Sequence, residues 1–249
     1  MLLRMISTAL LLAGLIPWFP ALASDATYQQ IATSAESLLE QDVAPKHSKK
    51  ISSVSVPFNP AIERATLIVT GADAPKLSEL QDAKGSKVNA RPESRIAQLT
   101  EMSNGFAIVV TKPGAGYWIL RWSSTKPAHV QVKIQSPEKE DTHIRGLEFV
   151  EFGGIPGHEA FAPKKDYVPA KGEIIPVEIA WSGPVRDGVF EAVSNSGASL
   201  GPLESLKDPH SPHVYRLRVP NQPFYVRLKG GDASGFPVQR YVPAPISPH

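Results

Sequence analysis

The sequence contains no cysteine, and this absence excludes several kinds of chemistry. Without cysteine the chain forms no disulfide bond, no thiolate zinc site, no iron–sulfur cluster and no cysteine nucleophile. An excess of charge of one sign is also missing, because 26 Lys and Arg residues face 24 Asp and Glu residues, a net charge of +2. Nucleic-acid binding requires a concentrated positive excess, so we expect no nucleic-acid partner.

Long apolar runs are confined to the first residues of the chain. Arg4 precedes an apolar run over residues 5–16, and Ala21-Leu22-Ala23 then supplies the small residues that a signal peptidase reads. This pattern predicts a signal peptide over residues 1–23, cleaved between Ala23 and Ser24, and a periplasmic or secreted protein. The run is shorter than the ~20 residues of a spanning helix, and we expect no transmembrane segment.

Proline and glycine are plentiful, with 24 and 18 residues, and they favour short strands joined by turns. Apolar and polar residues alternate with a period of two, for example over residues 116–122. The sequence therefore predicts an all-β fold of two antiparallel β-sandwich domains, immunoglobulin-like or related. The expected domains span residues 51–136 and 144–246, with a charged linker over residues 137–143.

One helix is predicted ahead of these strands, over residues 27–41. Ile31, Ala35, Leu38 and Leu39 recur there at helical spacing, and Asp25 or Thr27 is a candidate N-cap. A basic connector completes this N-terminal segment, residues 24–50.

Several segments resemble a known family. Leu67-Ile68-Val69-Thr70-Gly71 and Pro223-Phe224-Tyr225-Val226-Arg227 are similar to parts of the β-rich region that follows the von Willebrand factor A domain in hemicentin-like extracellular proteins. The resemblance covers about residues 51–246 and implies an extracellular scaffold. The A domain is absent, because its Asp-x-Ser-x-Ser motif does not occur here, so the family's metal-dependent ligand binding is not implied.

A candidate nucleophile lies in the second half. Residues 197–201 fit Gly-x-Ser-x-Gly, and Asp208, His210 and His213 follow Ser199 in the order of an α/β-hydrolase triad. Pro202 follows directly, however, and no alternating strand–helix pattern surrounds the motif. We interpret it as a coincidental match within a glycine-rich hairpin turn and expect no catalytic residue and no enzyme.

The histidines, lysines and tryptophans supply the remaining candidates. His210 and His213 are placed to share a metal with His158 or Asp208, but the spacing is that of a loop, so we expect no metal and no cofactor. Tryptophans at 118 and 122 share one strand face, and lysines at 164 and 165 lie in a long loop over residues 153–171. The candidate binding surface comprises Trp118, Trp122, His158, Lys164, Lys165, His210 and His213.

The predicted function is that of a non-catalytic exported scaffold that recognises another macromolecule through sandwich loops or sheet edges. Its expected partner is a protein of the envelope or extracellular space, or else a glycan. Three alternatives stay open at this point: a periplasmic inhibitor or immunity protein that caps a toxic enzyme, a serine hydrolase that uses Ser199, and a carbohydrate-binding module that uses Trp118 or Trp122.

Overall fold

A computed structural model describes residues 36–45, 51–155, 157–208 and 211–249. Over these residues the chain forms antiparallel β-sheets and no helix, which confirms the predicted all-β class. Residues Ala35–His249 belong to one compact unit. Within the described part of the chain, no helix has the length and apolar character needed to cross a membrane. The predicted signal peptide lies outside the described residues.

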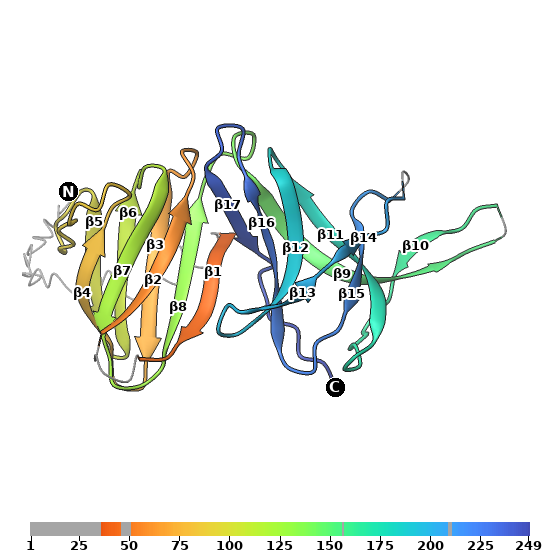
Figure 1. Cartoon of the computed structure of the whole chain (residues 1–249), viewed down its shortest axis with the longest axis horizontal. Helices are drawn as coiled ribbons and strands as arrows, with labels where there is room; N and C mark the ends of the chain where they lie inside the picture. The colour runs from red at the N-terminus through yellow and green to blue at the C-terminus, as the bar shows by residue number, and fades with distance from the viewer. Residues whose placement is uncertain (1–35, 46–50, 156, 209–210) are drawn as a thin grey trace, which may run out of the picture. The chain divides into compact units, whose positions relative to one another are not determined.

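Two sheets of the first half enclose one hydrophobic core, and we call them the first sheet pair (Figure 1). Alternating strand residues point into this core, among them Val54 and Val56. The five-stranded sheet consists, in spatial order, of β1 (Glu36–Val43), β8 (Ala128–Gln135), β3 (Arg64–Gly71), β6 (Gly105–Thr111) and β5 (Ala97–Met102). The three-stranded sheet consists of β2 (Ile51–Phe58), β7 (Gly116–Ser123) and β4 (Lys76–Gln81).

The second half contains another two sheets, which enclose a separate core and form the second sheet pair. One sheet consists of β10 (Ala160–Pro163), β9 (His143–Gly153), β11 (Ile174–Ser182), β15 (Val214–Arg218) and β14 (Glu204–Ser205). The other consists of β13 (Ser199–Pro202), β12 (Arg186–Ser194), β16 (Phe224–Gly231) and β17 (Pro237–Tyr241).

The predicted helix over residues 27–41 is wrong where the structure describes it. Residues from Glu36 onward form strand β1, which pairs with β8 along the edge of a sheet. A register shift between Ser37 and Leu39 lets the neighbours Leu38 and Leu39 both be buried. Consecutive buried residues of this kind imitate a helical pattern, and pairing with β8 decides the conformation. Residues 27–35 lie outside the described part.

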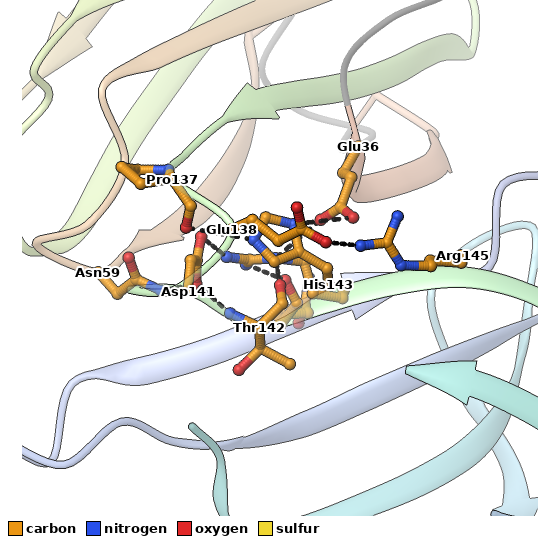
Figure 2. Close-up of polar contacts among 10 residues, drawn as sticks. Glu36, Asn59, Pro137, Glu138, Asp141, Thr142, His143 and Arg145 are labelled. Carbon is orange, nitrogen blue, oxygen red and sulfur yellow. Dashed lines mark hydrogen bonds and ion pairs between the residues drawn. The ribbon is translucent and has the colours of Figure 1, made fainter. Parts of the chain in front are cut away.

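The segment between β8 and β9, predicted as a linker over residues 137–143, ends in a buried polar network (Figure 2). Asp141 forms an ion pair with Arg240 of β17, whose side chain is 1% exposed. Arg240 also donates from Nε to the carbonyl oxygen of Thr142 at 2.8 Å. Asn59, which follows β2, donates from Nδ2 to Asp141 at 2.7 Å. The network thus fixes residues of the first sheet pair to β17 of the second.

Candidate functional site

The end of β9 and the whole of β10 form a two-stranded ribbon, residues 150–163. The first part of β9, as far as Phe149, pairs with β11, whereas its last part pairs only with β10. Figure 1 shows this ribbon continuing beyond the other strands of its sheet. A two-stranded ribbon has marginal stability in water unless another surface covers it, so its exposed side chains require an explanation.

Large apolar side chains are concentrated at the free end of the ribbon. Phe152 is 61% exposed, and Ile155, in the connecting turn, is 75% exposed. Phe161 lies opposite Phe152 in the strand register, and the two ring centroids are 5.2 Å apart. We call Phe152, Ile155 and Phe161 the apolar tip. Exposed apolar groups gathered at one point of a surface are typical of interaction sites.

Two hydrogen bonds link described residues on either side of the tip. The backbone N–H of His158 donates to the carbonyl oxygen of Ile155 at 2.8 Å. The N–H of Gly157 donates to the Glu159 carboxylate at 2.9 Å, so the only carboxylate of the turn is already engaged. Gly154 has φ of 134°, and a Cβ there would lie 2.7 Å from the carbonyl oxygen of His158. Glycine is therefore required for this close approach.

The base of the ribbon is polar and tied to the sheet. Lys164 donates its backbone N–H to the carbonyl oxygen of Phe149 at 2.8 Å, and its Nζ lies 3.8 Å from the centroid of the Tyr167 ring. The Tyr167 hydroxyl donates to Glu173, and this hydrogen bond raises the pKa of Tyr167 to about 12. The same bond lowers the pKa of the Glu173 carboxyl. Lys164, Tyr167 and Glu173 thus anchor the base of the ribbon, at the end opposite the apolar tip.

Three of the seven predicted binding residues belong to the ribbon region, although His158 is at its tip and the two lysines are at its base. His158, Lys164 and Lys165 lie on the ribbon or directly after it. His213 instead packs edge-on against Trp181, with ring centroids 5.7 Å apart, and His210 lies outside the described residues. The prediction missed the apolar tip, although the apolar residues within a stretch rich in glycine and proline were the signal that could have revealed it.

Trp118 and Trp122, two of the candidate binding residues, do not form an exposed aromatic surface. Both side chains point into the first core, where they are 4% and 0% exposed. The alternation along β7 that places them on one face makes that face the inward one, and Trp118 packs edge-on against Phe58. The exposed aromatic residue of this strand is Tyr117.

Ser199 is the first residue of β13, which forms a hairpin with β12. The turn is closed by hydrogen bonds between Ser194 and Ala198, and its Gly197 has φ of 78°. The Ser199 hydroxyl hydrogen-bonds to Glu191, a carboxylate that also pairs with Arg227 at 2.7 Å. Among the described residues, no group of three His, Cys, Asp or Glu side chains is placed to hold a metal ion.

Comparisons with known proteins give one remote likeness. No protein-family model matches the chain, and no curated protein matches it. The structure is similar to the crystal structure of lipase BlEst2 from Bacillus licheniformis in its propeptide form, with a TM-score of 0.30 and 10% sequence identity. The match covers 83% of this chain and 43% of the lipase chain, so this chain spans less than half the length of that protein.

This finding corrects the predicted function. The similar structure is that of an enzyme, whereas the sequence predicts a non-catalytic scaffold or an inhibitor, and we do not maintain that prediction. At this TM-score the likeness supports no activity for the present chain.

Proposed function

We propose that this protein docks onto the surface of a lipid bilayer by inserting the apolar tip of the β9–β10 ribbon. The observation that carries the proposal is the exposure of Phe152 and Ile155 at the free end of a hairpin whose base is anchored. Side chains of this kind stabilise peripheral proteins by entering the boundary between headgroups and acyl chains, to a depth of about 5–10 Å.

The size of the effect is sufficient for reversible docking. Complete burial of one large apolar side chain contributes roughly 1.5–3 kcal/mol. Phe152 and Phe161 already cover part of each other's rings, so the tip contributes less than the roughly 4–9 kcal/mol of three fully transferred side chains. A tip of this strength supports binding that reverses readily, because each 1.4 kcal/mol changes an affinity about tenfold.

A bilayer fits the tip better than a folded protein partner does. A stable protein interface buries about 800 Å² on each partner, which three side chains at the end of a ribbon do not supply. A bilayer yields around a protruding group and needs no complementary pocket. Residues 150–165 carry two carboxylates, Glu151 and Glu159, and two lysines, Lys164 and Lys165. This balance favours insertion driven by apolar burial over attraction to anionic headgroups.

Two predictions from the sequence accompany this proposal. The first is that the protein is exported after cleavage between Ala23 and Ser24, which would place it beside membrane and envelope surfaces. The second is that each sheet pair is a β-sandwich of the immunoglobulin-like type, related to the β-rich region of hemicentin-like proteins. Two facing antiparallel sheets around each core support this assignment.

Vesicle flotation tests the docking proposal directly. The full chain, as its host processes it, is mixed with phosphatidylcholine vesicles, and the fraction that floats is measured. Wild-type protein should float, and the double variant Phe152→Ser/Ile155→Ser should lose at least about tenfold in partitioning. Phe236→Ser/Ile174→Ser is the matched control, because it removes the same two exposed residue types elsewhere.

Circular dichroism checks that both double variants remain folded. Equal flotation of the tip variant and the wild type would refute the proposal. An equal loss in the control variant would also refute it, because binding would then come from general surface hydrophobicity.

A further inference from the structure

The first sheet pair is open along one side, between its edge strands β4 and β5. A cleft of about 440 Å³ with a mixed apolar and polar lining lies there. Its floor includes the buried side chains of Leu80 and Phe106, which belong to the first core. Other apolar lining residues are Leu77, Val88, Leu99 and Met102. The charged residues Lys76, Glu79, Lys87 and Glu101 also line the cleft, which therefore combines apolar surface reaching the core with charged side chains.

A second hollow, of about 590 Å³, adjoins this cleft at the end of the sheets. The two share the lining residues Lys87, Val88 and Asn89. Three lysines line the second hollow, Lys84 and Lys87 from the β4–β5 connection and Lys112 from the β6–β7 connection. None of them forms an ion pair with any residue that the structure describes.

The one acidic residue that lines this hollow is occupied by its own turn. Asp82 accepts hydrogen bonds at its Oδ1 from the backbone N–H groups of Lys84, at 2.9 Å, and Ser86, at 2.8 Å. Two carboxylates line the cleft, Glu79 and Glu101, and Glu79 is bound to Arg121 at 2.5 Å. Three lysines against one aspartate leave the lining of the hollow with a net positive charge.

Trp118 provides a separate indication of a ligand. Its side chain lines the hollow and is 4% exposed, and its indole Nε1–H has no hydrogen-bond partner among the described residues. A buried donor without an acceptor is costly. The indole of Trp122 is also unpartnered but lies away from this hollow's lining. Lys112 has φ of 48°, a conformation that is uncommon for a residue with a Cβ.

We propose that the first sheet pair binds an anionic amphiphile with a single acyl chain. The anionic head lies among Lys84, Lys87 and Lys112, and the chain passes over Val88 into the cleft between β4 and β5. Free fatty carboxylates and single-chain phosphates share this chemistry. The proposal rests on residues outside the ribbon and stands apart from bilayer docking.

Calorimetric titration of the full chain tests the inference, with ligands kept below their micellar concentrations. Dodecanoate should bind at least about tenfold more tightly than octanoate, because four additional methylene groups enter the cleft. Octanoate should in turn bind more tightly than neutral octanol. Dodecyl phosphate is compared with dodecanoate, and the tighter ligand of the two identifies the head group.

Charge variants locate the head. Lys84→Gln/Lys87→Gln/Lys112→Gln should weaken dodecanoate binding at least about tenfold. The matched control, Lys139→Gln/Lys165→Gln/Lys171→Gln, removes three exposed lysines that do not line the hollow and should bind dodecanoate as the wild type does.

The Trp118 indole N–H resonance, assigned with Trp118→Phe, gives an independent readout and should shift on binding. Equal binding of octanol and octanoate would overturn the inference. Unchanged binding by the triple variant, an equal loss in the control or a stationary indole resonance would do the same.

Discussion

Replacing Arg240 by methionine tests whether the buried network described above holds the molecule together. The guanidinium donates from Nε to the carbonyl oxygen of Thr142 at 2.8 Å and from Nη1 to that of Gln239 at 2.7 Å. It also forms an ion pair with the buried Asp141 carboxylate. Methionine keeps much of the side-chain volume but leaves the carboxylate uncompensated. Removing one partner of a buried ion pair costs about 3–5 kcal/mol.

For a chain of this size, such a loss lowers the melting temperature by roughly 6–20 °C. Urea unfolding at pH 7 measures the free energy of unfolding of the variant and of the wild type. Arg145→Met is the matched control, because Arg145 pairs with Glu138 at the surface, where a pair contributes at most about 1 kcal/mol. A loss in Arg240→Met as small as that in Arg145→Met would refute the reasoning.

The pH dependence of the same variant gives a second check. Burial alone would raise the pKa of Asp141, but Arg240, together with hydrogen bonds from Ser136 and Asn59, holds it below its usual value. This depressed pKa contributes stability above the unfolded value of about 3.9, which is lost as the pH falls through the folded value. Without Arg240, burial raises the pKa of Asp141. Protonation then removes the unpaired buried charge and reduces the loss of stability in the variant. The stability gap should therefore narrow as the pH falls from neutral toward about 4 and continue to narrow below it, and a gap that widens would contradict this account.

Three further predictions concern other parts of the molecule. Gly183→Ala should destabilise the fold by at least about 1–3 kcal/mol in urea unfolding, because φ is 105° and a Cβ would lie 2.1 Å from the carbonyl oxygen of Asp141; a change near zero would contradict the observed backbone. His129 is hydrogen-bonded to Glu40 and Asp42, and these bonds raise its pKa. The contribution of His129 to the free energy of unfolding should therefore be complete below about pH 6.5 and be lost as the pH rises through the folded pKa. His129→Gln should accordingly remove this pH dependence, and an unchanged profile would contradict it. Flotation with neutral vesicles should change less than about twofold between low and high salt, because docking relies on apolar burial; a steep fall would indicate electrostatic binding instead.

The sequence predicts the strands well wherever alternation and pairing agree. Over β7 the residues Trp118, Leu120 and Trp122 alternate with exposed or half-buried neighbours, and all three lie in the core. The same pattern does not determine which face points inward. For this reason Trp118 and Trp122 were candidates for a binding surface although they are buried. At β1 the local pattern failed, because the register shift beside Leu39 buries consecutive residues and only the partner strand β8 fixes the conformation.

The apolar tip shows why a strand pattern does not reveal exposure. Along β9, Val150 and Phe152 lie two residues apart and therefore share one face. Val150 is fully buried, so alternation would predict burial for Phe152 as well. Phe152 is nevertheless exposed, because β11 pairs with β9 only as far as Phe149 and the sheet narrows to two strands beyond that point. Exposure at the tip depends on where the pairing of β11 with β9 ends. The sequence of residues 150–163 does not contain this information. A search for surface-docking residues in such chains must therefore compare where paired strands end.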